Sequence, residues 1–258
     1  MILDEITSKR KAQLQREMDA VPLETVRRLA EKSAPPLAFK KALQKGGLSV
    51  IAEVKKASPS KGLICPNFDP ERIARSYEAA GADAVSVLTE EAYFQGSSAV
   101  LRKVRAAVRL PILRKDFIIS PYQIYEARAI GADAVLLIAA LHGTETLRGY
   151  KRVADSLGLA CLMEAHNEEE LEKILRAGAE IVGINNRDLT TFRVNLGTTA
   201  RLARLISAEC VLVSESGFQS RSDIEAAEKA GADAVLIGET LMRSDNPAAT
   251  LEELRGKP

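Results

Sequence analysis

The chain has 258 residues, of which 46% are hydrophobic, so it can bury a large core and disorder is excluded as a class. Its 36 basic and 35 acidic residues leave a formal net charge of +1. This balance argues against a dedicated nucleic-acid-binding or membrane-surface protein, and it is compatible with a local pocket for a small anion.

Targeting segments and metal motifs are not evident in the sequence. The first residues lack the basic start and apolar middle of a signal peptide, and the longest apolar run, residues 134–141, has the length of a strand. Cys65, Cys161 and Cys210 form no CxxC pair, and the two histidines complete no metal-ligand pattern. We therefore expect a cytoplasmic protein with reduced cysteines and without metal, nucleic-acid or membrane partners.

Residues 1–47 precede the repeating part of the chain and are predicted to form a helical extension. The expected helices cover residues 2–18, 23–30 and 37–44. Pro35 and Pro36 interrupt the path before the third helix. We expect the extension to pack across one end of a barrel that comprises residues 48–258, so that the two parts form one domain. An appendage that serves only stability or dimerisation is the alternative.

Four segments of the remaining chain resemble one another. They are residues 80–85, 130–135, 177–182 and 230–235. In each, a helix is expected to end at a glycine such as Gly81 in the left-handed conformation, and a short apolar strand such as residues 84–88 follows. Each interval between the segments has room for a second strand and helix. Further strands are expected over residues 49–55, 112–115, 159–164 and 211–214.

Eight alternations of strand and helix predict an α/β fold, a closed (β/α)8 or TIM barrel. An open doubly wound sheet is the competing fold. It is disfavoured because no G-x-G-x-x-G motif follows the first strand and because the repeat is regular.

Charged and polar residues stand at one end of five predicted strands, where a barrel strand should be apolar. The set consists of Glu53, Lys55, Lys115, Glu164, Asn185, Arg187 and Glu215. Barrel active sites form at the carboxyl ends of the strands, and residues two apart share one face of a strand. A single member is more often part of a rim ion pair, but buried unpaired charge is costly, so the whole set needs partners or a ligand. The mixture suits acid–base chemistry on an anionic substrate.

The ends of the last two predicted strands carry small residues, Ser216, Gly217 and Gly238. Backbone N–H groups hold phosphate at these places in many barrels, although ordinary turn glycines are the alternative. His142 and His166 are interpreted as polar loop residues. The acidic run 168–170 opens a helix and is interpreted as a complement to the helix dipole.

Several motifs together resemble the indole-3-glycerol phosphate synthase family. They are Glu53-Val-Lys55-Lys-Ala-Ser58-Pro-Ser-Lys-Gly62, Leu88-Thr-Glu-Glu-Ala-Tyr-Phe94, Leu113-Arg-Lys115-Asp-Phe117, Gly183-Ile-Asn185-Asn-Arg187, Ser214-Glu215-Ser216-Gly217 and Leu236-Ile-Gly238. The resemblance covers nearly the whole chain. One departure is Glu239, which stands where some relatives have a serine near the phosphate.

The resemblance implies a lyase of tryptophan biosynthesis that closes 1-(2-carboxyphenylamino)-1-deoxyribulose 5-phosphate to indole-3-glycerol phosphate with loss of CO2 and water. It implies no cofactor and a small phosphorylated substrate as partner. No fused partner domain is expected, because the barrel should end near Gly238 and only a short last helix follows. Lys115 is the implied general acid and Glu164 the general base, while Glu53 and Lys55 are supporting or competing candidates. How Lys55 and Lys115 divide the proton transfers stays open.

The other implied roles concern substrate binding. Asn185 and Glu215 would orient groups and complete the network, and Arg187 and Ser58 would contact the polar end of the substrate. Phe94 and Phe117 would form apolar walls around its aromatic ring.

Two other functions remain open from the sequence. One is a Schiff-base lyase in which Lys115 or Lys55 is the nucleophile, because a desolvated lysine beside another cation has the lowered pKa that this chemistry needs. The other is a non-catalytic barrel, which the concentration of charge at one end disfavours.

Overall fold

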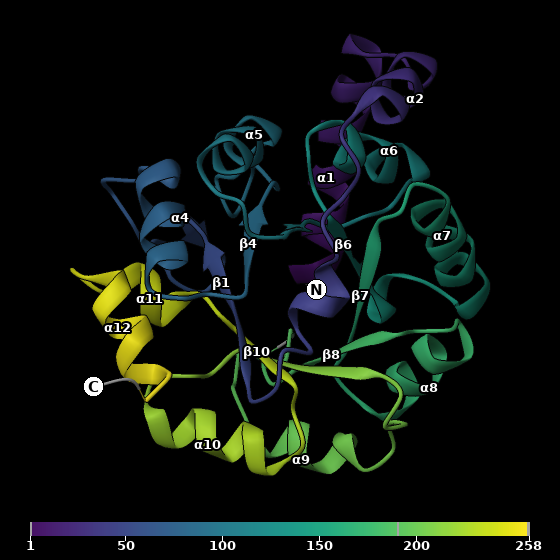
Figure 1. Cartoon of the computed structure of the whole chain (residues 1–258). Helices are drawn as coiled ribbons and strands as arrows, with labels where there is room; N and C mark the ends of the chain where they lie inside the picture. Colours follow the sequence, from purple (N-terminus) through teal and green to yellow (C-terminus); the bar gives the residue numbers. More distant parts are fainter. Residues whose placement is uncertain (1, 190, 257–258) are drawn as a thin grey trace.

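Eight parallel strands close into a barrel in the computed structural model, which describes residues 2–189 and 191–256 (Figure 1). The strands are β1 (Ser49–Val54), β4 (Ala84–Leu88), β5 (Ile112–Lys115), β6 (Ala134–Ile138), β7 (Ala160–Ala165), β8 (Ile181–Asn185), β9 (Val211–Glu215) and β10 (Ala234–Ile237). Each strand pairs with its neighbours in chain order, and β1 closes the ring by pairing with both β4 and β10. The predicted TIM barrel is confirmed, and the doubly wound alternative is wrong because the sheet has no open edge.

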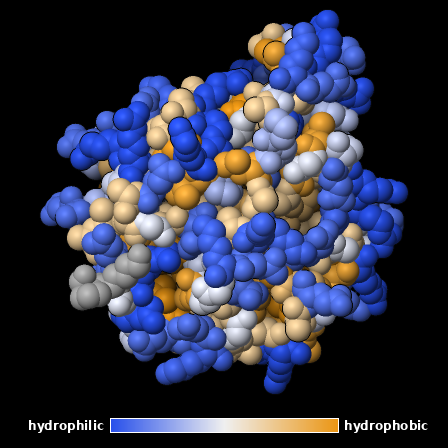
Figure 2. Space-filling view, in the orientation of Figure 1, coloured by the Kyte–Doolittle hydropathy of each residue, from blue (hydrophilic) through white to orange (hydrophobic). Residues whose placement is uncertain are grey.

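Helices between the strands form the outer ring (Figure 1). They are α4 (Pro70–Ala79), α5 (Ser98–Ala107), α6 (Pro121–Ala129), α7 (Thr144–Ser156), α8 (Glu168–Arg176), α9 (Gly197–Ala203) and α10 (Arg221–Lys229), and α11 (Glu239–Arg243) and α12 (Pro247–Leu254) follow the last strand. The loops also contain the short helix η1 (Ala139–Leu141) and a two-stranded hairpin of β2 (Ala57–Ser58) and β3 (Gly62–Leu63). Gly81 has φ of 85°, the left-handed conformation that the sequence pattern predicts after α4. Hydrophilic residues cover most of the outer helices in Figure 2. Within the described residues, no helix is both long and apolar enough to cross a membrane.

Alternation along each strand separates two cores. Outward residues such as Val50 and Ala52 pack under the helices, whereas Ile51 and its inward counterparts on the other strands fill the barrel interior. The next interior layer, toward the carboxyl ends of the strands, contains Glu53 and the charged residues at the ends of the other strands. The fold therefore collects the polar strand ends above the apolar interior layer that contains Ile51.

The repeated aspartates have a structural task that the sequence pattern did not reveal. Asp83 accepts a hydrogen bond from the backbone N–H of Val50 at 2.9 Å, and Asp133 accepts one from Ile112 at 2.7 Å. Asp233 accepts one from Leu212 at 2.8 Å. Each carboxylate thus ties the start of its own strand to the start of the preceding one.

Three helices precede the barrel: α1 (Ile2–Ala20), α2 (Leu23–Lys32) and α3 (Phe39–Ala42). Phe39 and Leu43 insert into the barrel interior, and the N–H of Leu37 donates to Asp133, so α3 lies at the amino ends of the strands. Helix α1 instead reaches the carboxyl ends, where Arg10 is paired with Asp116. Helix α2 projects from the ring beside α6 (Figure 1). We expected the extension to pack across one end of the barrel. In the described part of the chain, the extension instead reaches both ends, with α3 at the amino ends of the strands and α1 at the carboxyl ends.

Candidate active site

A cavity of about 550 Å³ opens at the carboxyl ends of the strands. It is lined by every site residue that the sequence predicted: Glu53, Lys55, Ser58, Phe94, Lys115, Phe117, Glu164, Asn185, Arg187, Glu215, Ser216, Gly217 and Gly238. These residues come from distant parts of the chain and from loops as well as strands. The barrel therefore brings the predicted set together in one place, although their individual roles stay predictions.

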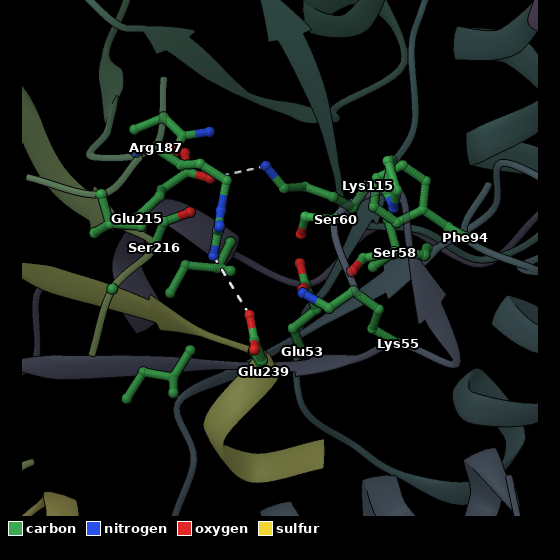
Figure 3. A pocket seen from close by; sticks show the side chains of 18 of the residues that line it. Glu53, Lys55, Ser58, Ser60, Phe94, Lys115, Arg187, Glu215, Ser216 and Glu239 are labelled. Atoms are coloured by element: carbon green, nitrogen blue, oxygen red, sulfur yellow. Dashed lines mark hydrogen bonds and ion pairs between the residues drawn. The ribbon is translucent and has the colours of Figure 1, made fainter. Parts of the chain in front are cut away.

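Lys115 at the end of β5 is held between two carboxylates. Its Nζ donates to Oε2 of Glu164 and to Oε2 of Glu215, each at 2.8 Å. All three side chains are at most 14% exposed, so the charges interact with little screening. The arrangement fixes the ammonium group at the wall of the cavity (Figure 3).

Two inward glycines leave room for the carboxylates. A Cβ at Gly183 would overlap Oε1 of Glu215, and a Cβ at Gly238 would overlap Oε1 of Glu53. Glu53 is in turn paired with Nζ of Lys55 at 2.6 Å. Gly238 thus serves the Glu53–Lys55 pair as well as being a candidate phosphate contact. Gly183 was not predicted as a site residue, although a glycine inside a strand often marks a place that another group approaches closely.

The predicted phosphate end lies where β9 and β10 finish. Ser216 has φ of 70° and Gly217 φ of 99°, so the chain turns sharply there, and a non-glycine residue in this conformation is often found at functional sites. Arg187 points from the other side of the cavity toward Glu239, with 3.4 Å between its Nη2 and Oε2 (Figure 3). Lys61 and Arg243 also pair with Glu239, at 3.8 and 3.2 Å.

The aromatic wall is fixed by buried carboxylates that the sequence did not single out. The rings of Phe94 and Phe117 stand 6.1 Å apart between centroids. Glu90 accepts three backbone N–H groups, including that of Phe94 at 3.0 Å, and Asp116 accepts that of Phe117 at 2.8 Å. These bonds hold the loops that carry both rings.

The family model for indole-3-glycerol phosphate synthase matches residues 3–254. A protein of that name from Ruminiclostridium cellulolyticum is 51% identical over 258 residues, covering 99% of both chains, and one from Endomicrobium trichonymphae is 48% identical over 257 residues, covering 99% of this chain and all of the relative.

The chain belongs to the indole-3-glycerol phosphate synthase family. It is accordingly an enzyme, as the sequence motifs implied.

Solved structures support the fold alone. A thiamine phosphate pyrophosphorylase from Pyrococcus furiosus matches with a TM-score of 0.62 at 18% identity, over 81% of this chain and 94% of that one. A mutant tryptophan synthase α-subunit from the same organism matches with a TM-score of 0.62 at 14% identity, over 81% and 98%. Both likenesses fit a barrel of this kind.

Burial and the neighbouring charges shift the pKa values of Lys115, Glu164 and Glu215 in different directions. Burial opposes the charge of Lys115, but Glu164, Glu215 and Glu53 outweigh it and raise its pKa above the ordinary value. Burial also opposes ionisation of Glu164, yet Lys115 and then His166 lower its pKa. For Glu215, burial together with Glu164 and Glu53 outweighs Lys115 and raises the pKa to about 7. The two carboxylates titrate as a pair, and Glu164 is the one that stays ionised.

The sequence missed three other parts of the site. Residues Ile2, Leu3 and Ile6 of α1 line the cavity, although nothing in a helical pattern tells which end of a barrel it covers. Arg10 and Asp116 form a fully buried ion pair behind Lys115. His166 lies in the loop after β7, as interpreted, but its burial against Glu164 was not foreseen.

Metal binding has no support within residues 2–189 and 191–256, where no group of three His, Cys, Asp or Glu side chains is arranged to hold an ion. The implied independence from cofactors and metals stays a prediction.

Proposed function

We propose that this member of the indole-3-glycerol phosphate synthase family converts 1-(2-carboxyphenylamino)-1-deoxyribulose 5-phosphate to indole-3-glycerol phosphate, with loss of CO2 and water. The observation that carries the proposal is the Lys115 ammonium group, 2.8 Å from each of two carboxylates in a cavity with aromatic walls. A charged donor beside an apolar wall suits attack of an aromatic ring on a ketone.

The first step assigned to Lys115 is general-acid catalysis. As the carboxyl-bearing ring carbon attacks the ketone carbon, the new C–C bond forms and Lys115 donates its proton to the ketone oxygen. Loss of CO2 returns the electron pair of the broken C–C bond to the ring. The raised pKa of Lys115 keeps this proton donor loaded at neutral pH.

The second step is dehydration. The hydroxyl group formed from the ketone leaves as water with a proton from the site. Glu164 is ionised because Lys115 lowers its pKa, and it takes a proton from the substrate. Lys55, paired with Glu53, is the second candidate donor for the departing water. Asn185 and Glu215 would orient the groups around this exchange.

Binding is assigned to the two ends of the cavity. The turn at Ser216 and Gly217, with Gly238, would hold the phosphate by backbone N–H groups. Arg187 and Ser58 would contact the substrate carboxylate, and Phe94 and Phe117 the aromatic ring.

The Schiff-base alternative is disfavoured by the same geometry. An amine nucleophile must be neutral, and the carboxylates around Lys115 stabilise its protonated form. Borohydride added with the substrate should therefore trap no adduct on Lys115 or Lys55.

The direct test is a fluorescence assay. The chain contains no tryptophan, so indole product formed by purified enzyme stands out against a low protein background. An increase in indole fluorescence with added substrate is expected, and substrate that remains unconverted by folded enzyme would refute the proposal. Inorganic phosphate should compete with the substrate if the assigned anchor is correct.

A further inference from the structure

His166 lies directly behind Glu164 and outside the set of described residues that line the cavity. It follows β7, and its side chain is only 11% exposed. A buried imidazole that does not meet the substrate must act, if at all, through a neighbour.

Both ring nitrogens of His166 face carboxylates. Its Nδ1 is 2.9 Å from Oε2 of Glu170, in the first turn of α8, and its Nε2 is 3.4 Å from Oε1 of Glu164. Glu170 is itself fixed, because its Oε2 accepts the backbone N–H of His166 at 2.9 Å and its Oε1 accepts Nδ2 of Asn167 at 3.0 Å. Within the described part of the chain, Nε2 has no hydrogen-bond partner at closer range.

This geometry selects the protonated ring. A neutral imidazole has one N–H, so it can donate to only one of the two carboxylates, whereas an imidazolium ion can donate to both. The charged and titratable groups around the ring are Glu170 on α8, Glu164 on β7 and Glu215 on β9, with Lys115 on β5 reached through Glu164. Burial disfavours the imidazolium charge, but Glu170, Glu164 and Glu215 outweigh burial and raise the pKa of His166.

We propose that His166 is a positioning residue for the reaction, in which its imidazolium group, oriented by Glu170, holds Oε1 of Glu164 while Lys115 holds Oε2. The inference rests on the proposed function of Glu164 as the base. Two donors on the two oxygens would fix the plane of the carboxylate and keep it ionised. The 3.4 Å separation leaves Nε2 a short movement from a hydrogen bond.

The sign of the pH effect follows from the raised pKa of His166. The imidazolium ion persists through the ordinary titration range of histidine and is lost only as the pH rises through the raised value. Removing the charge of Glu170 should bring that loss to lower pH. The kcat value should therefore begin to fall at lower pH, while KM is kept because His166 does not line the cavity.

The first experiment follows the ring directly by NMR titration. The chain has two histidines, so His142 provides an internal reference; burial, only partly offset by the carbonyl of Ile118, lowers its pKa. We expect His166 to titrate above the ordinary value of about 6.5 and to drop by about one unit in Glu170→Gln, the usual effect of losing a close opposite charge. Glu164→Gln should lower it as well.

Glu169→Gln is the matched control, because Glu169 opens the same helix but is 79% exposed and pairs with Lys173. This substitution should leave both histidines unchanged. A His166 that titrates at or below the ordinary value, or that responds no more to Glu170→Gln than to Glu169→Gln, would overturn the inference.

The second experiment compares kinetics in the same variants. The part of the alkaline decline of kcat that follows the His166 titration should move down by about one unit in Glu170→Gln, in step with the NMR titration, and KM should stay within about twofold. His166→Gln, which keeps a neutral N–H donor, should retain more kcat than His166→Leu, which should lose about tenfold or more. Unchanged kcat profiles in Glu170→Gln and His166→Leu would make His166 merely structural. Failure of the wild-type enzyme to convert the substrate would instead refute the proposed function, and the NMR titration would still test the contacts of the ring.

Discussion

Lys115 differs from the other cations of the cavity in having two buried carboxylates as partners. Arg187 and Lys55 each pair with one carboxylate in this part of the site. A group placed between two carboxylates is strongly oriented, and its proton is available only when developing negative charge on a substrate oxygen competes for it. The position therefore suits a donor that must be loaded before each turnover.

Replacing this donor tests its assigned role. Lys115→Met removes the charge with little change in length, so kcat should fall by at least about a hundredfold, the usual size of a general-acid contribution. Competition by inorganic phosphate should survive, because the assigned anchor is on β9 and β10. Steady-state kinetics measure both effects, and near-normal turnover would remove Lys115 from the mechanism.

Glu215 should give the enzyme a titration near neutrality. With its pKa raised to about 7, it is neutral below that pH and ionised above it. Ionisation adds negative charge beside Lys115, which makes the ammonium a weaker acid, so kcat should decline as the pH rises through this range. Glu215→Gln mimics the neutral form and should abolish that inflection in the pH–rate profile. An unchanged inflection would assign it to another group.

At the scale of single elements, the end of β10 links the two halves of the site. Gly238→Ala would place a Cβ against Oε1 of Glu53 and within 3.0 Å of Nζ of Lys55. We therefore expect this substitution to lower kcat as well as to weaken phosphate binding, unlike Lys115→Met. Weaker phosphate binding with an unchanged kcat would show that the Glu53–Lys55 pair can shift without loss of catalysis.

Helix α1 is tied to β5 by a buried ion pair. Arg10 donates to both oxygens of Asp116 at 2.9 and 3.0 Å, and Asp116 lies between Lys115 and Phe117 in the chain. Arg10→Leu should lower the free energy of unfolding by roughly 3 kcal/mol or more, because it leaves a buried carboxylate without one of its partners. It should also lower kcat per folded molecule. Arg16→Leu, on the exposed side of α1, is the control and should change neither measurably.

The sequence predicted elements best where one local rule decides. The strands at 84–88 and 112–115 have the predicted bounds, because Gly81 and Pro111 stand shortly before these runs and limit where each strand can begin. The inward set Glu53, Lys115, Glu164 and Glu215 followed from alternation together with the barrel. His166 and Arg10 could not be found in this way, since their partners lie across a fold that no local pattern specifies.

At the scale of the whole molecule, the amino ends of the barrel strands contribute to stability, and the carboxyl ends carry the candidate active site. Phe39 and Leu43 of the extension fill the interior at the amino ends, far along the strands from Lys115. We propose that the extension and the barrel form one folding domain, as the sequence led us to expect, because α3 is part of the same interior core.

Phe39→Ala tests this division. Loss of a buried aromatic ring should lower the free energy of unfolding by about 3 to 5 kcal/mol, while kcat per folded molecule stays near the wild-type value. Unfolding followed by circular dichroism should remain a single transition that moves to lower denaturant concentration. A separate early transition for the extension would contradict a single domain.

The aspartates that link the start of one strand to the start of the preceding strand are present at only some of the strand pairs described in the barrel. Asp83 joins β4 to β1, Asp133 joins β6 to β5, and Asp233 joins β10 to β9. At the start of β8 the corresponding residue is Glu180, which pairs with Lys40 and Lys151. A chain divided after β6 would keep all three aspartate ties inside its fragments, whereas a division between β5 and β6 would sever one. Split versions of this barrel should therefore reassociate more readily when the break falls in the loop that leads into α7.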